Sequence, residues 1–378
     1  MSEAARVDWK ENGLTHSALW LSDAGVAPPG RVVIADDRIN ADTAYRQACE
    51  GTALLWRGDF QNARQLLPAL ARRTDAPKRK APTAGEPGPP AQAFHRYRMA
   101  KAQRARTLGM LLIAFDPGHV IPLKRAPDVA KACTEARGPA AERYIASLRE
   151  LLGIISAYEW RRKGVEIPAL GARIHPHYGV FSPVRGEYID LLTRVKLPSH
   201  DLAFDIGTGT GVLAALLAKR GMRRVIATEN DARALACARD NVGRLGMAAR
   251  VDVREADMFP EGRAGLVVCN PPWLPGRAAT SLEHAVYDPD SRMLRGFLAG
   301  LAGHLLPGGE GWLIVSDLAE HLGLRTRDEL LAAIANAGLA VIERLDTRPT
   351  HRKAFDAGDP LAAARGSEVT SLWRLQAV

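Results

Sequence analysis

The chain has 378 residues, of which 47% are hydrophobic, and a formal net charge of +9. This length is too great for one ordinary compact domain, and the hydrophobic content is enough to bury a core, which excludes a chain that is disordered throughout. The apolar runs are far too short to cross a bilayer, and the first residues contain no apolar signal core, so we expect no membrane partner.

The cysteine content points to a reducing compartment. Only four cysteines are present, they are scattered, and none forms a C-x-x-C pair. That pattern favours reduced thiols in a cytoplasmic protein and gives no reason to expect a metal site or a disulfide framework. The residues concerned are Cys49, Cys133, Cys237 and Cys269.

Residues 1–73 are predicted to form an N-terminal α/β region. The apolar runs at 31–37 and 52–56 predict strands, and the pattern at 62–73 predicts a helix. Residues 74–92 contain five prolines and few apolar side chains, which predicts an extended linker or a long loop.

Residues 93–170 are predicted to continue the N-terminal domain as a basic, mixed helical region. The segment 94–106 carries five Lys and Arg and no acid, with Phe94 and Tyr97 interleaved. A strand is expected at 108–115 and a long amphipathic helix at 140–162.

The basic excess lies in the first half of the chain. Residues 1–200 hold 30 Lys and Arg against 20 Asp and Glu, whereas residues 201–378 hold 21 against 22. This asymmetry suggests an anionic partner such as RNA or the ribosome, since cations mixed with aromatic rings suit phosphates and stacked bases. An Arg-rich composition inherited from a GC-rich genome explains the excess equally well.

Residues 171–378 are predicted to form the catalytic domain. From residue 202 onward short apolar strands alternate with helices, which is typical of a mostly parallel sheet covered by helices on both faces. Strands are expected at 202–206, 224–229, 251–254, 266–269, 312–316, 339–345 and 369–375.

A glycine-rich loop joins the first of these strands to a helix. The sequence Asp205-Ile-Gly-Thr-Gly-Thr-Gly211 places glycines where a ligand can approach the backbone, before a helix N-terminus that suits a carboxylate or a phosphate. The spacing is G-x-G-x-G, and the sixth position of a dinucleotide pattern is occupied by Val212, which disfavours a dehydrogenase. The candidate cofactor-binding residues here are Asp205, Gly207, Thr208, Gly209 and Gly211.

Two acidic positions follow the next strands. Glu229 ends the second strand, where a carboxylate can accept hydrogen bonds from both hydroxyls of a ribose. Asp257 follows the third strand and is expected to accept from an adenine amino group, with Met258 and Phe259 against the ring; a simple loop cap is the alternative.

The sharpest feature is Asn270-Pro-Pro-Trp273, directly after a buried strand. Two prolines make the turn rigid and leave the carbonyls of Asn270 and Pro271 free to accept, while the Asn270 side chain adds another acceptor. With the flat face of Trp273, these groups describe a slot for a planar, amino-bearing substrate. The candidate catalytic residues are Asn270, Pro271, Pro272 and Trp273.

Together these residues resemble class I S-adenosylmethionine-dependent methyltransferases, in the small-domain group that carries an Asn-Pro-Pro-aromatic motif. The resemblance covers roughly residues 175–378. It implies a Rossmann-like α/β sheet of seven strands with the last strand antiparallel, beside a separate mixed α/β N-terminal domain. It also implies S-adenosyl-L-methionine as cofactor. One departure is Trp273, where members of this group typically carry Tyr or Phe.

The resemblance and the basic region together predict an N-methyltransferase that acts on an exocyclic amino group of a nucleobase in ribosomal or transfer RNA. A protein glutamine N-methyltransferase, with a protein substrate as partner, is the first alternative. A non-catalytic RNA-binding protein that retains the cofactor fold is the second.

Overall fold

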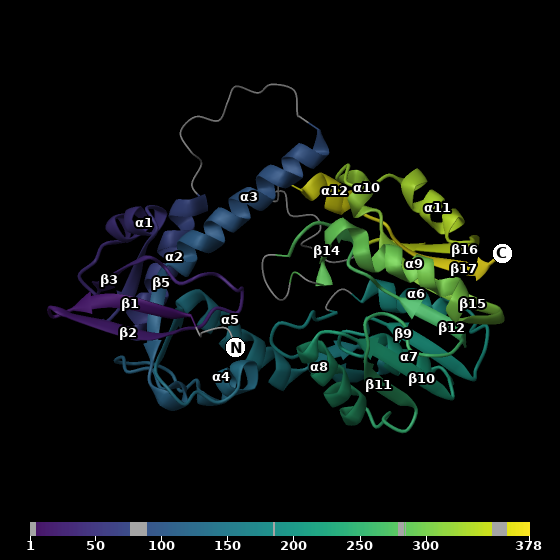
Figure 1. Ribbon diagram of the computed structural model, residues 1–378, viewed down its shortest axis with the longest axis horizontal. Coiled ribbons are helices and arrows are strands. Elements are labelled where there is room, and N and C mark those ends of the chain that lie inside the picture. Colours follow the sequence, from purple (N-terminus) through teal and green to yellow (C-terminus); the bar gives the residue numbers. More distant parts are fainter. Residues whose placement is uncertain (1–4, 76–88, 184–185, 279–282, 284, 350–360) are drawn as a thin grey trace. The chain divides into compact units, whose positions relative to one another are not determined.

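The chain folds into two units in a computed structural model that describes residues 5–75, 89–183, 186–278, 283, 285–349 and 361–378. The first unit comprises residues 5–75 and 95–159, and the second comprises residues 89–94 and 160–378 (Figure 1). Most of the predicted linker, residues 76–88, lies outside the described residues. Within the described residues, no helix combines the length and the apolar character that a membrane crossing requires.

The first unit is built on a six-stranded mixed sheet with the strand order β1-β2-β6-β5-β4-β3. Strands β3, β4 and β5 run parallel, β6 runs antiparallel to β5, and β1 and β2 form a hairpin at the edge. The hairpin turns at Asn12 and Gly13, whose φ angles of 51° and 77° are those that a tight two-residue turn demands. The strands are β1 (Arg6–Glu11), β2 (Leu14–Trp20), β3 (Arg31–Ala35), β4 (Thr52–Trp56), β5 (Leu111–Phe115) and β6 (Tyr144–Ser147). The helices are α1 (Ala41–Cys49), α2 (Phe60–Asp75), α3 (Pro90–Gly109), α4 (Ala130–Arg137) and α5 (Leu148–Lys163). The start of α3 and the end of α5 group with the second unit.

The predicted long helix over residues 140–162 is wrong in its first part. Residues Tyr144–Ser147 form β6, and the helix α5 begins only at Leu148. All four residues of β6 are buried, and the ring of Tyr144 stacks on Phe115 of the neighbouring strand with centroids 4.4 Å apart. Pairing inside the sheet therefore overrides the local helical pattern.

The second unit is built on a seven-stranded sheet with the order β11-β10-β9-β12-β15-β17-β16. The first five strands in this order run parallel, and β17 runs antiparallel to both of its neighbours. The predicted Rossmann-like α/β architecture is confirmed. The sheet strands are β9 (Leu202–Ile206), β10 (Arg224–Glu229), β11 (Val251–Glu255), β12 (Ala264–Cys269), β15 (Leu305–Ser316), β16 (Leu339–Thr347) and β17 (Thr370–Ala377). The helices are α6 (Glu187–Arg194), α7 (Val212–Lys219), α8 (Ala232–Arg244), α9 (Arg292–His304), α10 (Leu318–His321), α11 (Arg327–Asn336) and α12 (Ala362–Ser367).

Two short strand pairs complete the second unit. β7 (Val165–Ile167) pairs with β8 (Ala172–Ile174), and β13 (Leu274–Pro275) pairs with β14 (Tyr287–Asp288). Residues 160–170 were predicted to continue the N-terminal domain, but they group with the second unit. The reason is packing, because buried apolar side chains of β7 share one core cluster with α6 and α7.

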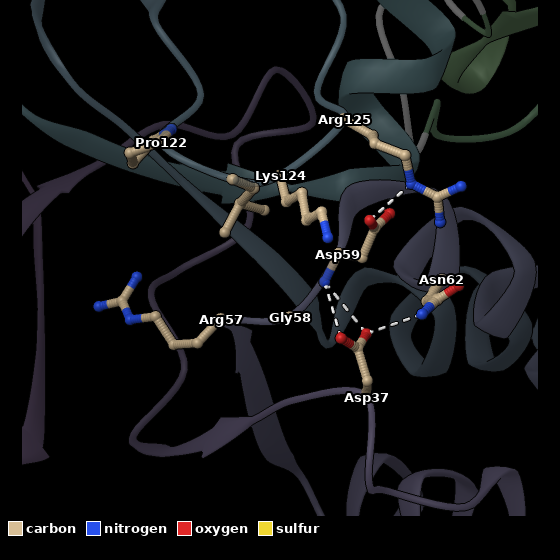
Figure 2. A pocket seen from close by; sticks show the side chains of 9 residues that line it. Asp37, Arg57, Gly58, Asp59, Asn62, Pro122, Lys124 and Arg125 are labelled. Carbon is tan, nitrogen blue, oxygen red and sulfur yellow. Dashed lines mark hydrogen bonds and ion pairs between the residues drawn. The ribbon is translucent and has the colours of Figure 1, made fainter.

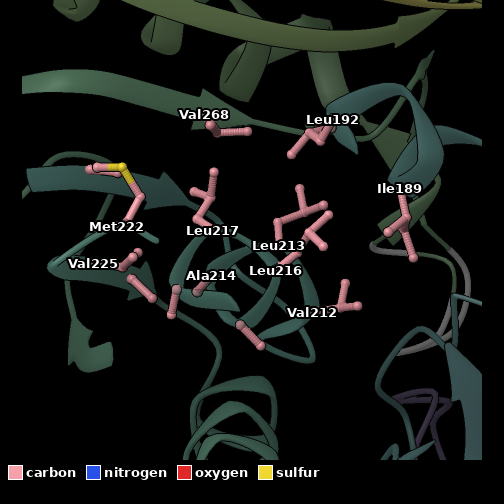
Figure 3. Packing of buried hydrophobic residues seen from close by; sticks show 14 of the residues in the cluster. Ile189, Leu192, Val212, Leu213, Ala214, Leu216, Leu217, Met222, Val225 and Val268 are labelled. Carbon is pink, nitrogen blue, oxygen red and sulfur yellow. The ribbon is translucent and has the colours of Figure 1, made fainter. Parts of the chain in front are cut away.

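The core of the second unit lies on both faces of the sheet. Side chains alternate along β12, so that Val268 joins the cluster beneath α7 while Val267 joins the cluster beneath α9. The strands are therefore apolar throughout, as expected for a sheet buried on both sides. α7 is apolar around its whole circumference, and Figure 3 shows Val212, Leu213 and Leu216 of this helix among the core side chains.

This topology fixes where a site can form. Because five neighbouring strands are parallel, their carboxyl ends at Ile206, Glu229, Glu255, Cys269 and Ser316 meet along one edge of the sheet. In open α/β sheets, ligands bind beyond that edge. Buried side chains of α7 and α9 belong to the two different core clusters, so these helices cover opposite faces of the sheet.

Candidate functional site

The glycine-rich loop leaves β9 at this edge and turns into α7. Its three glycines have φ angles of 68° at Gly207, 57° at Gly209 and 79° at Gly211, which side chains with a Cβ rarely adopt. The backbone N–H of Thr208 donates to the carbonyl of Thr228 over 2.9 Å and ties the loop to β10. A Cβ added at Gly209 would meet no atom within 4 Å, so the space beside this glycine is open.

Asp205 supports the loop from inside the sheet. Its Oδ2 accepts hydrogen bonds from the Thr208 hydroxyl at 2.6 Å and from the Ala214 N–H at 3.0 Å. The side chain is fully buried, and burial raises the pKa of this carboxyl from 3.8 to about 6. With these partners Asp205 fixes the shape of the loop, whereas its predicted contact with a cofactor stays a prediction.

Glu229 faces the loop from the end of β10. Its Oε2 accepts from the Gly209 N–H at 3.0 Å, and its Oε1 accepts from the N–H groups of Asn230 and Asp231 at 3.0 and 3.1 Å. The carboxylate is therefore oriented by three backbone donors. Of the two oxygens, Oε2 accepts the one bond from Gly209 and retains an acceptor site, which a ribose hydroxyl is able to use.

Asp257 and Met258 follow β11 at the same edge. Asp257 Oδ2 forms an ion pair of 2.6 Å with Arg292 of α9, and Oδ1 accepts from the Asn230 side-chain amide at 3.2 Å. Met258 has a φ angle of 82°, and its carbonyl accepts from the Thr228 hydroxyl at 2.6 Å. Its side chain packs against the core cluster beneath α9. Both predicted adenine contacts are thus held by specific partners.

The Asn270-Pro-Pro-Trp273 turn leaves β12 beside the glycine loop. In the parallel ladder Cys269 is paired with Ile206, so that Asn270 and Gly207 are the next residues of two adjacent strands. The indole N–H of Trp273 donates to Asn270 Oδ1 over 2.9 Å. Trp273 also packs against the core clusters on both faces of the sheet. The sheet register therefore brings the predicted catalytic turn next to the predicted cofactor loop.

The sequence interpretation missed the first turn of α9. Asp288 of β14 is buried, and its Oδ2 accepts from the N–H groups of Met293 and Leu294 at 2.9 and 3.2 Å. The Met293 methyl carbon lies only 2.2 Å from where a Cβ on Gly207 would stand. An Asp-Pro pair just before an apolar helical pattern is the signal that marks this helix start.

A separate cavity of about 580 Å³ lies in the first unit beyond the carboxyl ends of β3 and β4. Figure 2 shows how its two carboxylates are held: Asp37 accepts from the Asn62 side-chain amide at 3.0 Å, and Asp59 pairs with Arg125 at 2.6 Å. No residue of the predicted site lines this cavity. Both carboxylates are thus held by donors within the first unit.

Comparison with known proteins assigns the second unit. Residues 171–327 match the family model of the methyltransferase small domain. The release factor glutamine methyltransferase of Cereibacter sphaeroides is 33% identical over 159 residues, which cover 38% of this chain and 55% of that protein. The release factor glutamine methyltransferase of Mycolicibacterium smegmatis is 39% identical over 125 residues, or 31% of this chain and 44% of that protein.

A third relative carries a different name. The ribosomal protein L11 methyltransferase of Pelotomaculum thermopropionicum is 36% identical over 144 residues, covering 37% of this chain and 39% of that protein. The chain thus spans about half the length of the curated relatives it matches. Within residues 171–327 the predicted class is confirmed: this part of the chain is a class I methyltransferase small domain, an enzyme domain whose cofactor is S-adenosylmethionine.

Proposed function

We propose that the chain is an S-adenosylmethionine-dependent N-methyltransferase that methylates the side-chain amide of a glutamine in a protein substrate. The observation that carries this proposal is the pairing of Cys269 with Ile206, which sets the Asn270 turn beside the glycine loop. The names of two of the three relatives described above favour a glutamine over the nucleobase that the sequence interpretation put first.

The residues at the loop fit this cofactor. The open space at Gly209 and the N-terminus of α7 suit the amino-acid end of the ligand, and the Glu229 carboxylate suits its ribose. We expect Asp257 Oδ1, which accepts one bond from Asn230, to accept from its adenine as well. When bound, the cofactor supplies an electrophilic methyl group on a sulfonium.

The Asn270 turn supplies positioning rather than base catalysis. An amide nitrogen is a weak nucleophile because its lone pair is delocalised. Asn270 Oδ1 retains one acceptor site beside its bond from Trp273, and the Pro271 carbonyl carries another. Acceptors that hold the two N–H groups stabilise the partly positive, pyramidal nitrogen of the transition state more than the planar ground state. The nitrogen gains the methyl group as the sulfonium bond breaks, and one amide proton passes to solvent.

RNA is the competing acceptor, favoured by the basic first half of the chain. In α3, however, part of this charge is already used: Arg104 pairs with Asp75 at 2.8 Å, and the Lys101 ammonium lies 4.8 Å from the centroid of the Tyr97 ring. Cationic side chains with such partners within the protein are also found on helices that bind no phosphate, so the basic charge of α3 is weak support for an RNA substrate.

The test is a label-transfer survey with the full-length protein. The protein and a cofactor with an isotopic methyl label are incubated with a nuclease-treated protein fraction of a cell lysate. A separate incubation contains deproteinised RNA from the same lysate. We expect label on glutamine residues of a protein, located by peptide mass spectrometry, and transfer about a hundredfold or more lower with the Asn270→Ala variant. Label found only in RNA would overturn the proposed acceptor.

A further inference from the structure

One face of α9 packs against residues 257–259, the segment that follows β11. Arg292, Gly296 and Gly300 are spaced four residues apart and therefore share this face. They meet three consecutive residues in order: Arg292 pairs with Asp257 at 2.6 Å, a Cβ on Gly296 would lie 3.3 Å from Met258, and one on Gly300 would lie 2.5 Å from Phe259. Because three successive positions of this helix face contact Asp257, Met258 and Phe259 in order, α9 forms one wall of the predicted adenine site.

The far end of this contact is rigid. The ring of Phe259 fills the space over Gly300 and stacks on His304 with centroids 4.2 Å apart, and on Phe297 at 5.9 Å. Any side chain at Gly300 would have to displace the ring. The segment after β11 is therefore held in place by the middle and the end of α9.

The first turn of α9 is anchored as well. Asp288 accepts from the N–H groups of Met293 and Leu294, and the Met293 methyl group rests on Gly207 of the cofactor loop. Arg292 thus emerges from a turn that is fixed on two sides. Its guanidinium reaches Asp257 from a defined direction and occupies Oδ2, which leaves Oδ1 with the longer bond of 3.2 Å from Asn230.

We infer that Arg292 is a positioning residue for cofactor recognition, which holds the Asp257 carboxylate so that Oδ1 accepts from the adenine amino group. The ion pair is exposed, with 70% of the Arg292 side chain accessible, so its contribution is orientation rather than stability. This inference rests on the proposed cofactor and does not depend on the proposed methyl acceptor.

The experiment measures binding by calorimetry with two probes, S-adenosylhomocysteine and S-inosylhomocysteine. The second probe carries a carbonyl where adenine has its amino group, so the amino donor that Asp257 is expected to read is missing from it. The wild-type protein is expected to prefer the adenosyl probe by roughly tenfold or more, the value of one hydrogen bond to a charged acceptor. In Arg292→Gln this ratio is expected to shrink several-fold towards one, because the freed carboxylate loses its orientation. Arg292→Lys keeps the charge and should retain part of the ratio.

Arg295→Gln is the matched control, since Arg295 is an exposed arginine one turn along the same helix. It should leave both affinities unchanged. If Arg292→Gln weakens both probes equally, or neither, the residue has no part in reading the amino group and the inference is overturned. If the wild-type protein binds neither probe, the proposed cofactor fails together with it. Failure to find a glutamine acceptor leaves this binding result untouched.

Discussion

The indole N–H of Trp273 donates a 2.9 Å hydrogen bond to the side-chain oxygen of Asn270, three residues earlier in the same turn. This bond fixes which way the Asn270 amide faces and takes one of the two acceptor positions on its oxygen. A Phe or Tyr ring at position 273 has no donor at this place. The tryptophan is therefore more than a flat surface, because it sets the orientation of the neighbouring side chain.

Replacing Trp273 with Phe separates these two roles. The variant keeps an aromatic face but removes the donor, so we expect kcat to fall about tenfold while the affinity for S-adenosylhomocysteine stays unchanged. Steady-state kinetics with the labelled cofactor would measure the first quantity and calorimetry the second. An unchanged kcat would show that the hydrogen bond has no role in catalysis.

Asn270→Ala removes the acceptor itself. We expect methyl transfer to fall by about a hundredfold or more, the usual loss when one group that stabilises developing charge is deleted. Binding of S-adenosylhomocysteine should persist, because the glycine loop, Glu229 and Asp257 remain. Single-turnover transfer together with ligand-binding measurements tests the pair of expectations. Parallel loss of binding would place Asn270 in the cofactor site instead.

The buried carboxyl of Asp205 predicts a pH effect on stability. Burial raises its pKa in the folded state to about 6 from 3.8, so between these pH values the folded chain binds more protons than the unfolded chain. The free energy of unfolding should therefore fall as pH rises through this window, by roughly 3 kcal/mol at most. Denaturant unfolding of wild type and Asp205→Asn across the window should show this slope only in the wild type.

Asp252→Asn is the control of opposite sign. The Arg254 side chain holds the pKa of the Asp252 carboxyl below its usual range, so the stability that Asp252 contributes is present above that range and is lost as pH falls. Relative to the wild type, the two substitutions should therefore change the pH dependence of the free energy of unfolding in opposite directions, and changes of the same sign would argue against the account given for Asp205.

The contact between α9 and the segment after β11 makes two glycines of one helix behave differently. A Cβ at Gly300 would lie 2.5 Å from Phe259, whereas one at Gly303 would meet no atom within 4 Å. Gly300→Ala should therefore lower the free energy of unfolding by about 1–3 kcal/mol through overpacking. Gly303→Ala should raise it by up to about 1 kcal/mol, since alanine favours helix. Equal effects in chemical denaturation would contradict the packing described here.

Much of the second sheet could be predicted from local pattern. The bounds of β9 and β10 match the apolar runs, because strands buried on both faces are apolar throughout and end at glycine or acidic residues. The glycine spacing at 207–211 and the two prolines at 271–272 likewise predicted turns, because the backbone preferences of glycine and proline are local. The hairpin at Asn12-Gly13 had an equally clear signal, but it was not used to predict the first two strands.

The rest depends on partners that are distant in sequence. The pairing of Arg292 with Asp257 joins residues that are 35 apart in the sequence, and no local pattern around either residue predicts the other as its partner. The strand β6 looked like the start of a helix because the burial of its four residues comes from the sheet around it. Similarly, β15 begins at Leu305, well before the predicted strand at 312–316, because Leu305 already pairs with Ala264 of β12.

The most direct test of the central claim is a crystal structure of the full-length protein with S-adenosylhomocysteine. We expect the ligand at the carboxyl edge of the second sheet, with its amino-acid end on the loop from Gly207 to Gly211 and its sulfur facing the Asn270 turn. A ligand bound in the charged cavity beside Asp37 and Asp59, or at the opposite edge of the sheet, would contradict the account.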